Sequence, residues 1–161
     1  MARNRVWQAA AQDAADVAAL LIEFRDWAGG DSPSDASFRS SVARLLQEPD
    51  TVFLLACSGA GSPAAGVCQL RYRHSVWTGV DDCWLEDLYV NGDLRRTGLG
   101  RELVGAACEH ARARGCARIE LDVNDENRVA VSLYQAFGFS PRSKHMGSAA
   151  SRDLFMGLRL G

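Results

Sequence analysis

A strand, a glycine-containing turn and a helix follow one another in the middle of this chain, and they constrain its fold more than any other feature. The segment from Cys83 to Val90 is apolar enough for a strand, and a helix-compatible run begins near Gly98. Between them stands Arg95-x-x-Gly98-x-Gly100. Glycine lets a ligand approach the backbone closely, and the first amides of a helix have no partners within it. The junction therefore predicts an anion site, most naturally for a phosphate or pyrophosphate.

The elements after this junction complete a crossover. A helix from Gly98 to about Gly115 is followed by an apolar segment at 117–123 that predicts a second strand. Two strands joined through a helix should lie parallel in one sheet. A shorter helix then begins near Asn127, carries Tyr134 and ends at Gly138.

The rest of the chain predicts further strands and two helices, with no repeat or linker that would divide it. We therefore expect a single domain over residues 1–161. Two of the strands are separated by a Gly- and Ser-rich turn and should form a hairpin. The polar segment from His74 to Asp81 predicts a loop. The additional strands are expected at 5–10, 51–57, 64–73, 139–141 and 153–160. Helices are expected from 13 to about 27 and from 34 or 35 to near Pro49.

Two motifs give the chain a specific family resemblance. Arg95-x-x-Gly98-x-Gly100 resembles the Arg/Gln-x-x-Gly-x-Gly/Ala motif of the GNAT acetyl-CoA-dependent N-acyltransferase superfamily. The run from Asn127 to Phe139 resembles the family's Asn-x-x-Ala-x-x-Leu-Tyr-x-x-x-Gly-Phe motif. The resemblance implies an α/β fold in which a mixed, splayed β-sheet is flanked by helices. It also implies transfer of an acetyl group from acetyl-CoA to an amine.

The same resemblance assigns the acetyl-CoA site. The pantetheine arm would bond free backbone groups of Leu88 and Val90, and the Leu88 amide would polarise the thioester carbonyl. The arginine side chains near the turn have an alternative as a solvated helix start, and Asn127 has one as a helix cap. The expected cofactor-binding residues are Leu88, Tyr89, Val90, Arg95, Arg96, Thr97, Gly98, Leu99, Gly100, Arg101, Asn127 and Tyr134.

Tyr134 and Glu86 are the expected catalytic residues. Tyr134 matches the family tyrosine that faces the coenzyme A sulfur, where its hydroxyl would protonate the departing thiolate. Its alternative is a core tyrosine between helix and sheet. An attacking amine must be neutral, and at pH 7 a lysine-like amine is about 4.6 kcal/mol away from that state. Leu85-Glu86-Asp87 resembles the polyamine acetyltransferases of the superfamily. We expect Glu86 to be the base, directly or through water, or else a carboxylate that binds a cationic acceptor.

Strand alternation supports this choice of base. It puts Trp84, Glu86 and Leu88 on one face, with Asp87 and Tyr89 on the other, so that Glu86 would share a face with the thioester-binding position.

Acceptor contacts are expected from the N-terminal helix pair and from loops. In the resembling family this helix pair forms one wall of the acceptor site. Carboxylates at 81, 82, 86 and 87 would gather beside the thioester and favour a small cationic amine, polyamine- or aminoglycoside-like. Protein N-terminal or lysine acetylation, and a non-catalytic acyl-CoA sensor, stay open as alternatives. The expected acceptor contacts are Asp26, Trp27, Asp31, Trp77 and Glu86.

A dinucleotide-binding fold is the main rival. Gly98-x-Gly100 opens a helix, and Asp122 follows at roughly the distance of a ribose contact. However, the third glycine position is Leu103, and no earlier strand–glycine–helix unit precedes it. We therefore assign the pyrophosphate site to coenzyme A.

The composition of the chain argues against several kinds of partner and location. A net charge of −2 argues against a nucleic-acid partner, and no apolar run is long enough for a membrane helix. Five cysteines without metal-ligand spacing predict free thiols and no metal site, and their odd number without a secretory signal predicts a cytoplasmic protein. Heavy use of arginine and alanine indicates a GC-rich bacterial genome, and the resemblance allows a homodimer.

Overall fold

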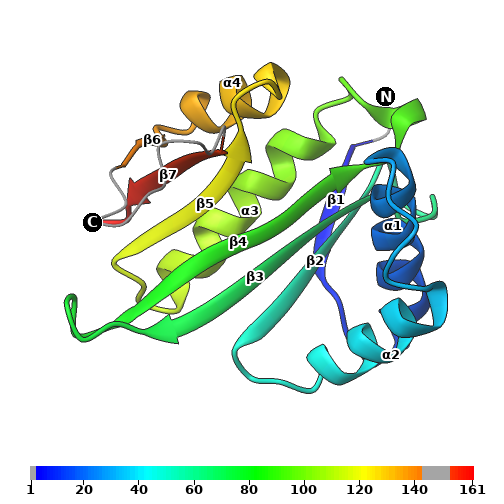
Figure 1. Ribbon diagram of the computed structural model, residues 1–161, viewed down its shortest axis with the longest axis horizontal. Helices are drawn as coiled ribbons and strands as arrows, with labels where there is room; N and C mark the ends of the chain where they lie inside the picture. The colour runs from blue at the N-terminus through cyan, green and yellow to red at the C-terminus, as the bar shows by residue number, and fades with distance from the viewer. Residues whose placement is uncertain (1–2, 143–152) are drawn as a thin grey trace.

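The computed structural model describes residues 3–142 and 153–161. Within them, one sheet of seven strands runs in the order β1-β2-β3-β4-β5-β7-β6 (Figure 1). The strands are β1 (Arg5–Gln8), β2 (Thr51–Cys57), β3 (Gly66–His74), β4 (Asp81–Val90), β5 (Arg118–Asn124), β6 (Ser140–Pro141) and β7 (Asp153–Arg159). The helices are α1 (Ala14–Trp27), α2 (Asp35–Leu45), α3 (Leu99–Ala113) and α4 (Arg128–Ala136), with short 3₁₀ turns η1 (Ala11–Asp13) and η2 (Gly92–Leu94).

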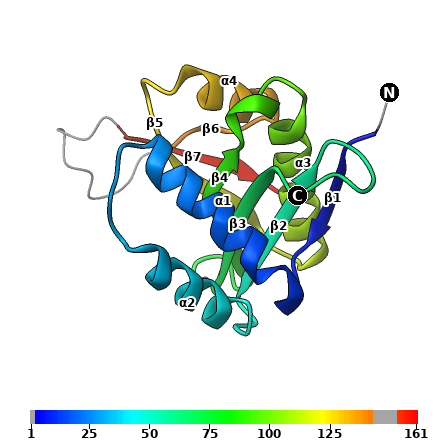
Figure 2. The same cartoon turned by 90° about the vertical axis from the view of Figure 1, so that its right-hand side faces the viewer.

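Helices cover both faces of the sheet, which gives two hydrophobic cores (Figure 1, Figure 2). On one face α3 presents Leu103 and Val104 to the sheet, because its apolar side chains recur at helical spacing. On the other face Val17 and Leu20 of α1 pack with Leu55 of β2. Each such fully buried side chain contributes roughly 1.5–3 kcal/mol. The β2–β3 hairpin is buried from both sides, which explains the continuous apolar run of β2.

The strand pairing confirms the predicted crossover and removes the dinucleotide-binding rival. β4 and β5 are parallel and joined through α3, as predicted. The other strand pairs in the described residues are antiparallel. A doubly wound parallel sheet is therefore not the fold of this chain. No helix in the described residues is long and apolar enough to cross a membrane.

β4 and β5 separate soon after they meet. Their register joins Cys83 to Ile119 and Trp84 to Glu120, and the ladder then stops. β5 continues to pair with β7 as far as Asn124. The separating ends leave a gap in the middle of the sheet, so the predicted splay is confirmed (Figure 1).

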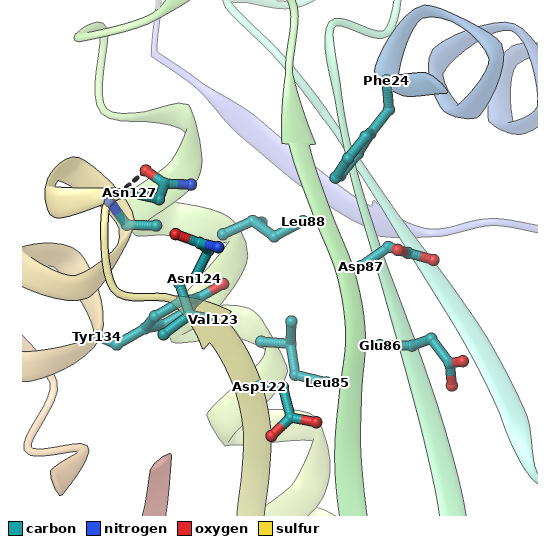
Figure 3. A pocket seen from close by; sticks show the side chains of 11 residues that line it. Phe24, Leu85, Glu86, Asp87, Leu88, Asp122, Val123, Asn124, Asn127 and Tyr134 are labelled. Carbon is teal, nitrogen blue, oxygen red and sulfur yellow. Dashed lines mark hydrogen bonds between the residues drawn. The ribbon is translucent and has the colours of Figure 1, made fainter. Parts of the chain in front are cut away.

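A β-bulge at Glu86 overturns the predicted alternation along β4. Gln69 of β3 pairs with Asp87, but the next residue of β3 pairs with Leu85, so Glu86 is the extra residue. An extra residue shifts every later side chain to the opposite face. Leu88 consequently joins Leu85 on the α3 side, while Glu86 and Asp87 both project from the other side of β4 (Figure 3). The expectation that Glu86 shares a face with Leu88 was wrong.

The predicted loop from His74 to Asp81 is also shorter than expected, because β4 begins at Asp81. Asp81 forms an ion pair with Arg114 at 3.3 Å, and Asp82 forms one with Arg118 at 2.8 Å. These carboxylates lie at the start of β4 and are neutralised there by arginines. They do not join the cluster of negative charge predicted beside the thioester.

Candidate active site

A pocket of about 240 Å³ lies where β4 and β5 separate (Figure 3). Leu85, Val123 and Tyr134 line it from the face covered by α3 and α4. Phe24 of α1 lines it from the opposite face. The pocket therefore passes through the plane of the sheet. Its lining residues are Phe24, Leu85, Glu86, Asp87, Leu88, Asp122, Val123, Asn124, Asn127, Ala130 and Tyr134.

The backbone of β4 offers free hydrogen-bonding groups to this gap. Asn91 donates its amide to Ala65 O at 2.8 Å, in the register that pairs Val90 with Gly66. Bonded and non-bonded pairs alternate along an antiparallel ladder. Leu88 and Val90 therefore direct their amide and carbonyl groups away from β3 and toward β5, which has already diverged. Sequence reasoning assigned the acyl donor to these two residues.

The turn between β4 and α3 presents amides instead of side chains. Arg96 has a φ of 63° and Gly98 a φ of 88°, and α3 begins directly afterwards. The amides of the first helical turn, from Leu99 onward, have no carbonyl partner within the helix. Thr97 donates its hydroxyl to Leu94 O at 2.5 Å, which closes the turn from inside.

Space around the two motif glycines is open. A β-carbon on Gly98 would lie no closer than 3.7 Å to Asn4 Nδ2, and one on Gly100 would lie 3.5 Å from Leu133 Cδ2. The left-handed backbone at position 98 therefore favours glycine, whereas no contact within the protein requires glycine at position 100. The absence of a side chain at position 100 would let an anion approach the backbone closely.

Two of the predicted cofactor arginines, Arg95 and Arg101, pack on aromatic rings. Arg95 places its guanidinium 4.6 Å from the Trp27 ring centroid and donates from Nε to Val90 O at 3.2 Å. Arg101 lies over the Phe137 ring at 5.6 Å. Both cations therefore lie near the turn between β4 and α3, which sequence reasoning assigned to the phosphates. Arg95 thus donates to one backbone group of Val90, a residue that the resemblance assigned to pantetheine, and leaves the Val90 amide free of this contact.

Tyr134 lies at the floor of the pocket. The residue is 5% exposed, and its ring centroid lies 5.6 Å from that of Phe139. Burial raises the pKa of Tyr134 far above its usual value, with Cys68 and Asp87 adding to the effect. A tyrosine phenol is protonated at neutral pH even without this shift, and Figure 3 shows it directed toward the gap between the strands. Its role as a proton donor stays a prediction.

Asp87 is a candidate base that sequence reasoning named only as one of four acceptor-side carboxylates. Burial, and to a lesser extent the neighbouring Glu86 carboxylate, together raise the pKa of Asp87 to about 6. A carboxyl group in this range accepts a proton near neutral pH, which is the property of a general base. Both carboxylates line the pocket, but Glu86 is exposed and Asp87 half-buried.

Two asparagines border the pocket from the β5–α4 connection. Asn127 Oδ1 accepts from Ala130 N at 3.2 Å and so caps α4, and Asn127 also lines the pocket. Both of its proposed roles, helix cap and pocket residue, are compatible with this position. Asn124 lines the pocket as well and was missed, since it ends an unremarkable strand.

The remaining predicted acceptor contacts do not reach the pocket. Asp26 bonds to Arg25, and Trp27 lies under Arg95 with 58% of its surface exposed. Asp31 stands exposed between α1 and α2. Trp77 is 91% exposed in the turn between β3 and β4. This turn precedes β4, whereas the turn that leads into α3 follows it. Their role in acceptor binding stays a prediction.

Comparison with known proteins decides the family. A family model described as Acetyltransferase (GNAT) family matches residues 14–139. The chain belongs to this family. Acetyl-CoA is the acetyl donor of GNAT acetyltransferases, and the site fits it, with a splayed strand pair, free backbone groups on β4 and an amide-lined turn before α3.

Named relatives act on amines. A thialysine N-epsilon-acetyltransferase from Mus musculus is 28% identical over 152 residues, covering 86% of this chain and 85% of that protein. One from Sus scrofa is 36% identical over 101 residues, or 63% of this chain, and the match spans only 55% of that protein. An aminoglycoside N(6')-acetyltransferase type 1 from Acinetobacter genomosp. 13 is 31% identical over 107 residues, covering 65% of this chain and 73% of that protein.

A solved structure supports the fold. An acetyltransferase of the GNAT family from Streptococcus pneumoniae superposes with a TM-score of 0.75 at 21% identity, covering 99% of this chain and all of that one. At this identity the likeness concerns the fold.

Proposed function

We propose that the protein transfers the acetyl group of acetyl-CoA to the primary amine of a small cationic molecule. The pocket between β4 and β5 carries this proposal, because it joins the donor side of a GNAT fold to two carboxylates, Glu86 and Asp87. Bound acetyl-CoA would supply an acyl thioester, which is an activated electrophile.

On the donor side, each role belongs to a fixed group. The amides of Leu99, Gly100 and Arg101 at the start of α3 bind the phosphates. The Leu88 amide offers a preorganised donor to negative charge that develops on the acyl oxygen, a form of stabilisation that often contributes most to catalysis. Tyr134 gives its phenolic proton to the leaving sulfur.

On the acceptor side, the two carboxylates divide the work. Asp87 accepts the proton of the attacking amine, since its pKa of about 6 leaves it ionised yet basic at neutral pH. Glu86, exposed at the pocket, binds the cationic acceptor. This replaces Glu86 with Asp87 as the proposed base and keeps Glu86 as a binding residue. Thialysine and aminoglycoside acetyltransferases among the relatives support a small amine over a protein acceptor.

We also propose that the protein is a homodimer in a reducing bacterial cytoplasm, because that compartment suits its five buried free thiols.

Larger acceptors would reach beyond the pocket. We propose that they contact Asp26, Trp27, Asp31 and Trp77.

Two measurements separate this function from its alternatives. Calorimetry with acetyl-CoA tests the donor site, and release of free thiol with a panel of amines and peptides tests the reaction. We expect micromolar binding and thiol release with small amines. Binding without turnover on any amine would identify a sensor, and turnover only with peptides would identify a protein acetyltransferase.

A further inference from the structure

The acceptor side of the pocket is flanked by a cation. Arg71 lies on β3, two positions from Gln69, which pairs with Asp87. Its neighbours Leu70 and Tyr72 belong to the core beneath α3. Side chains alternate along a strand, so Arg71 projects from the same face as Asp87. The Arg71 side chain is exposed.

Arg71 and Glu86 carry opposite charges on neighbouring strands without bonding to each other. Arg71 pairs in register with Trp84, which puts Glu86 at a diagonal position that long side chains can span. Yet neither Arg71 nor Glu86 has an ion pair or a side-chain hydrogen bond within residues 3–142 and 153–161. Both charges are therefore available to a ligand.

The three charged groups differ in depth. Arg71 and Glu86 are exposed, whereas Asp87 is half-buried and lines the pocket. Trp84 stacks on Phe155 of β7 with ring centroids 6.1 Å apart, so its indole leans away from the β3 side. A molecule that approaches from this face passes the exposed Arg71 and Glu86 on neighbouring strands before it reaches Asp87.

We propose that the acceptor is an α-amino acid whose side chain ends in a primary amine, and that Arg71 selects it. The α-carboxylate binds the Arg71 guanidinium, whose planar fork matches two carboxylate oxygens. The α-ammonium binds Glu86, and the side-chain amine reaches Asp87. This inference rests on the proposed function. The side-chain nitrogen forms a bond to the acetyl carbon as the carbon–sulfur bond breaks, its proton passes to Asp87, and the sulfur takes the Tyr134 proton.

The arrangement separates amino acids from plain diamines. A diamine has no carboxylate for Arg71, and its second ammonium is repelled by the guanidinium. Removing the Arg71 charge should therefore lower kcat/KM for amino acids and raise kcat/KM for diamines. A structural role for Arg71 would instead change both in the same direction.

The experiment measures kcat/KM for L-lysine against cadaverine and for L-ornithine against putrescine, since each pair differs only in the carboxylate. Arg71→Gln should lower the amino acid to diamine ratio by about 10-fold or more, mainly through KM. Arg71→Lys should restore part of this ratio. Arg73→Gln is the matched control, because Arg73 is exposed on the same face of β3, two residues farther from Glu86. It should change the ratio less than about 2-fold.

The outcomes distinguish this inference from the function beneath it. If diamines are acetylated but Arg71→Gln leaves the ratio unchanged, or if Arg73→Gln has the larger effect, the role of Arg71 is refuted and the acetyltransferase remains. If neither series is acetylated but another small amine such as an aminosugar is, the amino acid inference fails and the acetyltransferase remains. If no amine at all is acetylated although acetyl-CoA binds, both proposals fail.

Discussion

At the scale of single residues, Asp87 shows how position sets chemistry. It is adjacent in sequence to Glu86, yet Asp87 is half-buried while Glu86 faces solvent. The bulge puts both carboxylates on one side of β4, and burial together with the negative charge of Glu86 raises the pKa of Asp87 to about 6. The pair therefore has a testable pH signature.

Activity should rise with pH through about 6 as Asp87 loses its proton. Asp87→Asn should lower kcat/KM by roughly 10²–10⁴-fold and remove this acidic limb. Glu86→Gln should move the limb to lower pH, because a negative neighbour no longer holds the pKa of Asp87 up. The measurement is a pH profile of kcat/KM for the best amine. An acidic limb that survives in Asp87→Asn would assign it to another group.

Tyr134 permits a second prediction at this scale. Tyr134→Phe keeps the ring against Phe139 and removes only the hydroxyl. We expect kcat to fall by about 10²–10⁴-fold while the dissociation constant for acetyl-CoA stays within a few-fold. Single-turnover kinetics and calorimetry measure the two quantities separately. Full activity in the Phe variant would make Tyr134 a packing residue.

At the scale of elements, the turn between β4 and α3 depends on its backbone. Gly98→Asp and Gly100→Asp should both abolish coenzyme A binding, since a carboxylate would oppose the phosphates. Gly98→Asp also forces a side chain into a φ of 88°, at a cost of about 1 kcal/mol or more. Gly92→Asp is the control, because a β-carbon there meets nothing within 4 Å and its φ is not positive.

Calorimetry with coenzyme A measures the affinity, and circular dichroism checks that each variant is folded. We expect a folded protein without detectable binding for positions 98 and 100, and near-normal binding for the control. Undiminished affinity in Gly100→Asp would place the phosphates elsewhere.

The same elements show where sequence reasoning succeeds and fails. Strand β2, helix α3 and the parallel β4–β5 pair were predictable, because apolar periodicity and a glycine-marked turn specify them. The bulge at Glu86 was not predicted, since no glycine marks it and its trace in the sequence is only the adjacent polar pair Glu86-Asp87 between Leu85 and Leu88. One extra residue thereby put Leu88 on the face opposite to Glu86.

At the scale of the whole molecule, the burial and pairing of charged groups were hidden from the sequence. Asp81 and Asp82 looked like loop residues, but arginines 33 and 36 positions away in the chain pair with them. Such contacts depend on the assembled sheet and α3. The pKa of Asp87 depends in the same way on burial, which only the folded chain creates.

Hydrogen-bonded side chains also link three elements, β3, α3 and β1. Tyr72 donates to His110 Nδ1 at 2.6 Å, and His110 Nε2 donates to Gln8 Oε1 at 3.2 Å when the ring is neutral. Burial, and then the charge of Arg114, lowers the pKa of His110. The His110 imidazole therefore takes up a second ring proton less readily in the folded state than in the unfolded state.

Stability should fall as pH drops through the unfolded-state value of about 6.5, because the unfolded chain then takes up the proton first. The contribution is fully present above that pH. Urea unfolding at about pH 7.5 and about pH 5.5 measures it in the wild type and in His110→Gln. The variant should show a smaller loss between the two conditions. An equal loss in both proteins would exclude His110 as the source.

The pocket that crosses the sheet has a consequence for how such an enzyme diversifies. Its donor half is lined by α4, the end of β5 and the leucines of β4, and its acceptor half by Phe24 of α1 and the carboxylates Glu86 and Asp87 of β4. Mutations that alter acceptor choice therefore accumulate on one surface without touching the machinery on the other. Duplicated copies of the gene can acquire new acceptors by a few exchanges at positions such as Arg71 and Glu86, while the thioester chemistry is inherited intact.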